Sequence, residues 1–222
     1  MKFYRFGDKL IMQIFSICPK SFASNTYLLT SKHSAIVIDP SVSVDAITEK
    51  LKSENVILKG ILLTHGHFDH IISIDTIRER YDVPVYIHKD DACMLTDGKL
   101  NGFYLFFNRD CIHKPADILF KDEFKIQLDD ESITVFQTPG HSKGSSCFVF
   151  TDDKIGTSLV TGDTLFSNSV GRCDLYGGDK KELENSIKKM FSFDKNSPIY
   201  PGHGESSKLG FALDNIACFF DL

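Results

Sequence analysis

The sequence feature that most constrains the fold is a short run that holds four side chains able to bind a metal. It reads Thr64-His65-Gly66-His67-Phe68-Asp69-His70. The run directly follows an apolar segment, residues 56–63, whose composition is typical of a buried β-strand. Apolar residues at roughly helical spacing follow it and predict a helix from Asp69 to about Tyr81. We therefore expect the four side chains on a strand-to-helix loop at the carboxyl end of the strand.

The residue types in this run indicate a metal site. A tight loop can turn His65 and His67 toward one point, while Asp69 and His70 face a second point nearby. Imidazole and carboxylate ligands suit zinc, iron or manganese, and the lack of a neighbouring cysteine argues against a structural zinc site with thiolate ligands. An accidental grouping of loop histidines is the simpler alternative, but it explains four such residues at this spacing less well.

Composition and charge limit the classes of function. The 222 residues can form one domain over residues 1–222, because no segment has the composition of a linker. The formal net charge of −5 favours neither nucleic acid nor an anionic membrane surface as a partner. No apolar run approaches the roughly 20 residues of a membrane-spanning helix. We expect a small-molecule substrate, no nucleic-acid partner and no membrane partner; the oligomeric state stays open.

The cysteines indicate the compartment. They are scattered singly along the chain, without a C-x-x-C pair, as is typical of reduced thiols in a cytoplasmic protein. We therefore expect a cytoplasmic location. The six residues are Cys18, Cys93, Cys111, Cys147, Cys173 and Cys218. We expect Cys173 to lie in a loop beside the active site.

The N-terminal segment has two interpretations. Basic residues precede an apolar run over residues 10–18, and Ser21-Phe22-Ala23 follows it, a pattern that a weak signal peptide also shows. Gln13 and Ser16 interrupt the run, and more strand pattern follows at once. A first β-strand explains these features as well.

The rest of the pattern alternates strands with helices. Helices are expected at residues 44–53, 69–81, 89–96 and 179–191. Strands are expected at residues 10–18, 25–30, 35–39, 56–63, 83–88, 124–128, 133–137, 147–151, 155–161 and 199–200. This order fits two β-sheets packed face to face with helices on the outside. A long stretch at residues 97–115 has no regular pattern and contains aromatic residues, which either line the mouth of a substrate pocket or pack as a surface lid.

Three further strand ends each place one candidate ligand beside a glycine, which permits sharp turns and close backbone approach. They are His141, Asp163 and His203. Asp39 also follows a strand, and there it either orients a ligand histidine or caps a turn. His33 and His88 have no motif partners, and we expect structural roles for them.

Taken together, these motifs resemble the metallo-β-lactamase superfamily, from about Asn25 to Glu205 and in the order of that family. The resemblance implies an α+β fold, a four-layer αββα sandwich of two mixed β-sheets with helices outside. It also implies two divalent metal ions, zinc in the first place with iron or manganese as alternatives. By position, the first ion would be bound by His65, His67 and His141, the second by Asp69, His70 and His203, and both by Asp163.

Within the superfamily, Gly162-Asp163-Thr164-Leu165-Phe166 and Val170-Gly171-Arg172-Cys173-Asp174-Leu175 look most like the glyoxalase II group and its shorter relatives. That resemblance implies hydrolysis of a thioester such as S-D-lactoylglutathione, by attack of a metal-bridging hydroxide on the carbonyl. Asp69 would also be catalytic, because it could orient the hydroxide or pass a proton to the leaving group. Arg172 would bind glutathione, although an ion pair with Asp174 is an equal alternative.

Several departures from the group bear on the substrate. Only 19 residues follow His203, whereas glyoxalase II continues into a C-terminal helical domain that contacts glutathione, so we expect a weaker, different or absent grip on glutathione here. Ser41 stands where a glycine is usual, Ile71-Ile72-Ser73 replaces small residues, and Lys143 replaces a common proline. A persulfide dioxygenase with one iron on His65, His141 and Asp163 is the main alternative. A lactonase or other ester hydrolase, and a catalytically silent module, are further alternatives.

Overall fold

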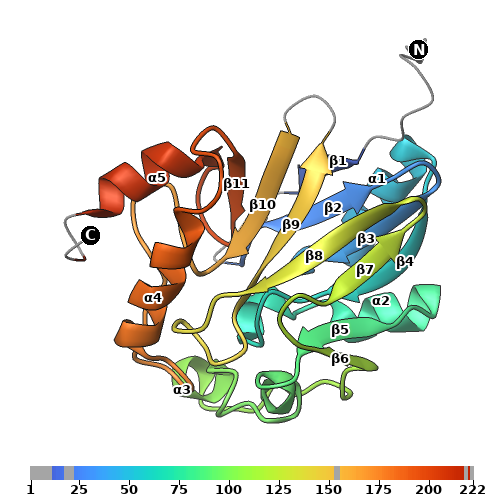
Figure 1. Ribbon diagram of the computed structural model, residues 1–222. Coiled ribbons are helices and arrows are strands. Elements are labelled where there is room, and N and C mark those ends of the chain that lie inside the picture. Colours follow the sequence, from blue (N-terminus) through green and yellow to red (C-terminus); the bar gives the residue numbers. More distant parts are fainter. Residues whose placement is uncertain (1–11, 18–22, 153–155, 218–219, 221–222) are drawn as a thin grey trace.

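Two six-stranded β-sheets form the centre of the part of the chain that the structure describes, residues 12–17, 23–152, 156–217 and 220 (Figure 1). This is a computed structural model. The basic N-terminal segment on which the signal-peptide interpretation rests, and Cys18 and Cys218, lie outside the described residues. No helix among the described residues is long and apolar enough to cross a lipid bilayer.

The first sheet has the strand order β1-β2-β3-β4-β5-β6. Its strands are β1 (Gln13–Ile17), β2 (Thr26–Thr30), β3 (Ser34–Ile38), β4 (Ile57–Leu62), β5 (Val85–His88) and β6 (Ile118–Phe120). The first three strands are antiparallel, and β3 to β6 run parallel. The strand expected at residues 56–63 is therefore β4, with a parallel neighbour on each side.

The second sheet has the order β12-β11-β10-β9-β8-β7. Its strands are β7 (Lys125–Leu128), β8 (Glu131–Gln137), β9 (Ser146–Asp152), β10 (Gly156–Gly162), β11 (Pro198–Pro201) and β12 (Ser207–Lys208). Only the pair β10 and β11 is parallel. Both sheets are thus mixed, as expected.

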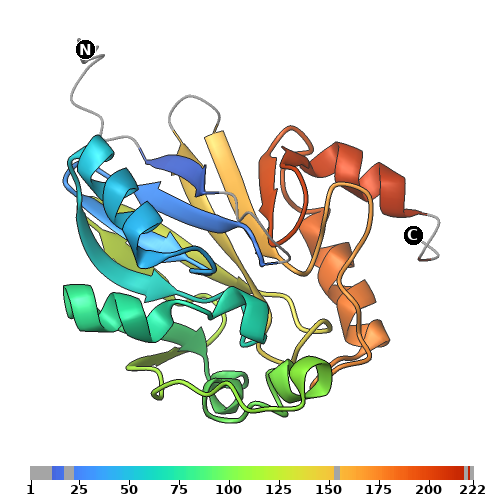
Figure 2. The same ribbon diagram turned by 180° about the vertical axis from the view of Figure 1, so that it is seen from behind.

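Side-chain alternation along the strands separates three buried cores. In β2, Tyr27 and Leu29 pack between the sheets with Phe148 of β9, whereas Leu28 packs on the opposite face with α1 (Val44–Glu54) and α2 (Ile74–Tyr81). The outer face of the second sheet packs against α4 (Lys180–Met190) and α5 (Leu209–Ile216). Figures 1 and 2 show these two helix pairs on opposite sides of the sheets. The expected four-layer αββα arrangement is confirmed.

The helix expected at residues 69–81 begins later than the sequence pattern indicated. The chain forms a 3₁₀ turn at Phe68–His70, and α2 starts only at Ile74. Bonds from distant segments hold this turn, because Phe68 N donates to Asn101 O at 3.0 Å and Ser24 N donates to Asp69 O at 3.3 Å. Asp69 therefore lies in the middle of a 3₁₀ turn and does not begin the helix.

Two further expectations were wrong in detail. The helix expected at residues 89–96 is a short 3₁₀ helix, Ala92–Thr96. The stretch at residues 97–115 is not free of regular structure, because it contains the short helix α3 (Phe103–Phe107). The sequence pattern also did not indicate β6, β12 or α5, which are short elements at sheet edges or follow the last motif.

Candidate metal centre

The seven candidate ligands come from loops of both sheets. His65 and His67 follow β4, Asp69 and His70 lie on the 3₁₀ turn after them, and all four belong to the first sheet. The second sheet supplies the remaining three: His141 from the β8–β9 loop, Asp163 directly after β10, and His203 after β11. The structure brings these side chains together in three overlapping groups, within each of which the ligand atoms lie no more than 4.8 Å apart.

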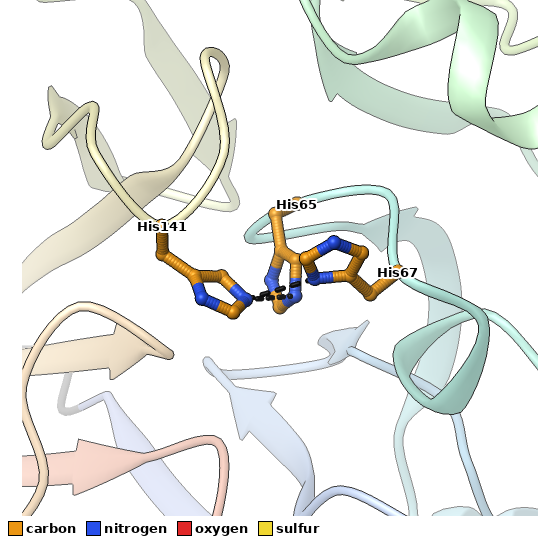
Figure 3. Close-up of side chains that lie close together, drawn as sticks. All are labelled: His65, His67 and His141. Carbon is orange, nitrogen blue, oxygen red and sulfur yellow. Dashed lines mark hydrogen bonds between the residues drawn. The ribbon is translucent and has the colours of Figure 1, made fainter. Parts of the chain in front are cut away.

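The first group consists of three histidines (Figure 3). His67 Nδ1 lies 2.8 Å from His141 Nε2, and His141 Nε2 lies 3.2 Å from His65 Nε2. All three rings are buried. Three ring nitrogens that face one another in this way can offer their lone pairs to one cation.

The second group combines carboxylates with histidines. His203 Nε2 lies 3.1 Å from Asp69 Oδ2, and His70 Nε2 lies 3.9 Å from the same oxygen. Asp163 belongs to the third group, with His65 and His70, and lies between the other two, because its Oδ2 is 3.6 Å from both His141 Nε2 and His203 Nε2. Its other oxygen, Oδ1, is 3.3 Å from His70 Nε2. Asp163 is thus placed to contact ions at both groups.

Three buried atoms of candidate ligands lack a hydrogen bond of good geometry. They are His67 Nε2, His70 Nε2 and Asp163 Oδ1, the last two of which lie 3.3 Å apart. A buried polar atom without a partner costs about 1–3 kcal/mol, so such atoms normally face a ligand or water. Gly202 makes this close arrangement possible, because a Cβ atom there would collide with Asp163 Oδ1 and lie 2.7 Å from His70 Cε1. The residues present therefore fit divalent cations.

The charges of the site point the same way. Burial lowers the pKa of His65 well below its ordinary value, and burial together with His141 lowers the pKa of His67 to about 3. Both rings are therefore neutral, with free lone pairs. Burial acts to raise the pKa of Asp163, but His70 outweighs it and holds that pKa well below its usual range. Burial acts to lower the pKa of His70, but Asp163, Asp39 and Asp69 raise it well above its ordinary value, so this ring has to release a proton to bind a cation. Carboxylates and imidazoles together are a donor set that zinc, iron and manganese accept.

Hydrogen bonds outside the cluster orient the histidine rings. His141 Nδ1 donates to Arg172 O at 2.7 Å, which leaves Nε2 to face the cluster. His70 Nδ1 bonds Asp39 Oδ2 at 2.9 Å with the same result. Asp39 also accepts bonds from Thr64 N at 2.8 Å and Thr64 Oγ at 2.6 Å. Of the two roles considered for Asp39, the structure shows the contact with a histidine ring that the orienting role requires.

Asp91 is a site residue that the sequence pattern did not reveal. Its buried carboxylate accepts hydrogen bonds from Gly66 N at 3.3 Å, Ser142 Oγ at 2.6 Å and Gly144 N at 2.7 Å. It therefore joins the loop of His65 and His67 to the loop of His141. Its partners lie 25 to 53 residues away in the sequence, so no local motif marks it.

The candidate ligands open into a cleft of about 350 Å³. Five of them line it, together with Phe68, Phe106, Phe166, Leu175 and Arg172. Arg172 forms a two-point ion pair with Asp174, Nε to Oδ1 at 2.6 Å and Nη2 to Oδ2 at 2.7 Å. The ion pair considered as its alternative role is thus present, while the side chain still borders the cleft.

The cysteines and the isolated histidines have no ligand role in the described residues. The four described cysteines, Cys93, Cys111, Cys147 and Cys173, are free. Cys173 Sγ contacts Gly171 O at 3.7 Å, and burial raises the pKa of its thiol. His33 is an exposed turn residue whose backbone N donates to Asp129. His88 is buried beside Phe120, with ring centroids 5.8 Å apart.

Comparison with known proteins gives consistent matches. A family model described as the metallo-beta-lactamase superfamily matches residues 20–203. A probable metallo-hydrolase of Streptococcus pyogenes serotype M6 is 37% identical over 211 residues, which cover 92% of this chain and 89% of the relative. The crystal structure of the BLEG-1 B3 metallo-beta-lactamase is 34% identical with a TM-score of 0.84, covering 91% of this chain and 97% of that one. The structure of TTHA1623 in a di-iron-bound form is 30% identical with a TM-score of 0.74, covering 89% and 96%.

Proposed function

Because the chain belongs to the metallo-β-lactamase superfamily, we propose that it is a metal-dependent hydrolase that binds two divalent ions and cleaves a thioester of a small molecule. The observation that carries this proposal is the convergence of seven candidate ligand side chains, three of which have a buried atom without a hydrogen bond of good geometry. A di-iron-bound structure of a protein 30% identical to this chain supports the presence of two metal ions.

Each side chain has a place in this proposal. His65, His67 and His141 would hold one ion, Asp69, His70 and His203 would hold the other, and Asp163 would serve both. When bound, two divalent ions lower the pKa of a water molecule and polarise the carbonyl oxygen of a substrate. The hydrolysis forms a carbon–oxygen bond from water and breaks the carbon–sulfur bond, and the leaving thiolate takes up a proton.

We assign the proton transfer in this reaction to Asp69. Its carboxylate lines the cleft and is only partly buried, in contrast to the other ligands of the first sheet. Ser24 Oγ donates to its backbone carbonyl at 3.1 Å, and Ser41 Oγ donates to the same atom. Ser41, which stands where a glycine is usual, thus helps to fix Asp69. A carboxylate held in this way can orient the attacking water and pass its proton to the leaving thiolate.

A second candidate function is hydrolysis of a β-lactam amide. It is favoured by the 34% identity to BLEG-1, which is described as a B3 metallo-beta-lactamase. The same centre would polarise the lactam carbonyl, and Asp69 would hand the proton to the leaving nitrogen. A chromogenic β-lactam therefore belongs in the first set of assays.

The test is metal analysis followed by hydrolysis assays on protein purified without added metal or chelator. We expect about two zinc, iron or manganese ions per chain, and thiol release from S-D-lactoylglutathione or a simpler acyl thioester. Replacing His141 by alanine should lower the metal content and reduce kcat/KM at least about 100-fold, because a ligand is lost. His33→Ala is the matched control, since His33 is an exposed turn residue, and it should change neither quantity.

Two results would contradict the proposal, and a third would contradict only the binding role of Arg172. Unchanged metal content in His141→Ala would remove that residue from the ligands. Close to one iron per chain, with no hydrolysis of any ester, thioester or lactam, would favour the mononuclear persulfide dioxygenase. An Arg172→Ala variant with an unaltered KM for S-D-lactoylglutathione would show that Arg172 keeps its pair with Asp174 and does not bind glutathione.

A further inference from the structure

Helix α3 exposes large apolar side chains beside the cleft. Leu105, Phe106 and Phe107 are 66%, 53% and 50% exposed, although all three lie within one short helix. Single exposed apolar residues are common, but a contiguous group is typical of a surface that binds something. Figures 1 and 2 show α3 at the lower edge of the molecule, away from α5.

This group is fixed to the ligand motif itself. Phe68, which lies between His67 and Asp69 in the chain, has its ring centroid 5.5 Å from that of Phe103 and 5.7 Å from those of Phe106 and Phe107. We call these four phenylalanines the aromatic wall. Such spacings are those of packed aromatic pairs, which stabilise each other beyond the burial of their surface.

Hydrogen bonds of Asn101 hold the aromatic wall in place. Asn101 is fully buried, its backbone O accepts from Phe68 N at 3.0 Å, and its Oδ1 accepts from Phe103 N at 2.9 Å. Its side-chain amide donates to Cys111 O at 2.8 Å, which holds the far end of the same loop. The wall therefore keeps a defined position relative to the metal centre.

The wall continues into the cleft. Phe68 and Phe106 line it, and Phe166 and Leu175 add further apolar surface. Leu175 also borders a neighbouring cavity of about 320 Å³, whose lining includes Tyr104 and Leu105 of α3. Apolar surface thus extends from the candidate metal ligands along α3.

The cleft itself has one cation among the described residues that line it, Arg172, and Asp174 already pairs with its guanidinium. Lys99 lines only the neighbouring cavity, where Asp174 also lies. If the thiol of the substrate were glutathione, its two carboxylates would find only Arg172 in the cleft, and the guanidinium of Arg172 is already paired with Asp174. An apolar substituent instead meets the wall, where its burial is favourable.

We propose that this centre acts on thioesters that carry a large apolar substituent, which packs against Phe68 and Phe106. The inference rests on the proposed function and specifies its substrate class. The substituent belongs either to the acyl group or to the thiol, and both share the same chemistry, a hydrocarbon chain or ring of roughly six or more carbons. Full burial of one methylene corresponds to about a fourfold gain in kcat/KM, and we expect about twofold in a cleft open to solvent.

The test uses the zinc-loaded protein and two series of thioesters. One series joins acetyl, butanoyl, hexanoyl and octanoyl groups to N-acetylcysteamine, and the other joins the acetyl group to thiols of increasing chain length. We expect kcat/KM to rise about twofold per methylene in at least one series. The series that shows the rise identifies the part of the substrate that the wall receives.

Variants of exposed phenylalanines test whether the aromatic wall causes the dependence of kcat/KM on chain length. Phe106→Ala should reduce the octanoyl-to-acetyl ratio of kcat/KM several-fold. Phe211→Ala removes an equally exposed ring, 58% exposed, from α5, and should leave that ratio unchanged. Thermal melting confirms that each variant is folded. A ratio that is the same in Phe106→Ala and in the unaltered chain would overturn the proposal.

A binding measurement separates this inference from the proposed function. Calorimetric titration with acetate, butanoate, hexanoate and octanoate gives an affinity series that needs no hydrolysis. If no thioester is hydrolysed, the proposed function fails, while an affinity that rises with chain length and falls in Phe106→Ala still supports an apolar subsite. If neither rate nor affinity depends on chain length, the subsite is wrong, even where thioesters are hydrolysed.

Discussion

At the scale of single residues, two buried carboxylates outside the group of candidate ligands, Asp39 and Asp91, hold parts of the site in position. Asp39 bonds the ring of His70 and the backbone of Thr64, so it fixes one ligand and the start of the motif. Asp91 touches no ligand side chain but bonds backbone or side-chain groups in two ligand loops. Burial raises the pKa of Asp91, although three donors oppose the shift. Each donor thus compensates part of the cost of burying this carboxyl group.

Replacing Asp91 by asparagine tests this positioning role. The amide NH₂ would face at least one of the donors from Gly66, Ser142 and Gly144, because all three point at the carboxylate. We expect metal affinity at the three-histidine group to fall about 10- to 100-fold, the usual effect of disturbing groups that orient ligands. Competition with a chromophoric chelator measures the affinity.

Asp90→Asn is the control for that variant, because Asp90 is the neighbouring residue and its carboxylate lies 2.9 Å from Lys89 Nζ and 3.7 Å from His88 Nδ1. Titration with cobalt(II) adds a spectroscopic measurement, which would not change if Asp91 only stabilised the fold. The visible spectrum of one of the two bound ions should change while that of the other persists. Equal affinity and equal spectra in the Asp91 variant and the unaltered chain would show that the carboxylate does not position the loops.

At the scale of elements, one carboxylate joins turns of the two sheets. Asp129 follows β7, and its Oδ2 accepts bonds from His33 N at 2.9 Å and Ser34 N at 3.2 Å in the turn between β2 and β3. Its Oδ1 accepts from Ser34 Oγ at 2.7 Å. Burial would raise the pKa of Asp129, but these donors lower it below the ordinary value. The ionised form therefore stabilises the folded state.

The pH dependence of stability follows from the direction of this shift. A carboxyl group with a depressed pKa in the folded state adds stability above its unfolded pKa, near pH 4, and loses it as the pH falls further. We expect Asp129→Asn to lower the free energy of unfolding at pH 7 by about 1–2 kcal/mol. Denaturant unfolding at pH 7 and pH 3 should show a smaller difference at pH 3. A difference that grows on acidification would contradict the assigned role.

At the scale of the whole molecule, the candidate centre links the two sheets. His65, His67, Asp69 and His70 belong to the first sheet, and the other three ligands belong to the second. The chain must be folded before these loops meet. A ligand that binds only the folded state stabilises it in proportion to the logarithm of its concentration over its Kd.

Metal removal should therefore lower the melting temperature. At a metal concentration near 100 times Kd the gain is about 2.7 kcal/mol, which for a chain of this length corresponds to roughly 5–10 °C. Scanning calorimetry with and without a chelator measures the shift. His141→Ala should show a much smaller one, and an identical melting temperature in both conditions would mean that metal does not bind the folded protein.

Local sequence patterns were sufficient for most elements near the site. The apolar run before Thr64 predicted β4, and the helical spacing at residues 44–53 and 179–191 predicted α1 and α4. These predictions succeed because strand and helix periodicity depend on residues close in sequence. The pattern also placed the seven candidate ligands at strand ends, and their coordination of metal stays a prediction.

Only the tertiary structure decided where those ligands meet and what supports them. The 3₁₀ turn at Phe68–His70 replaces the first turn of the expected helix because Asn101 and Ser24 bond it from other loops. Asp91 has no local signal, because its partners lie far away in the chain. The aromatic residues at 97–115 were visible in the sequence, but their packing against Phe68 was not. Local chemistry in the sequence therefore determined which residues could bind a metal, whereas contacts between distant segments decided their geometry and the apolar surface beside them.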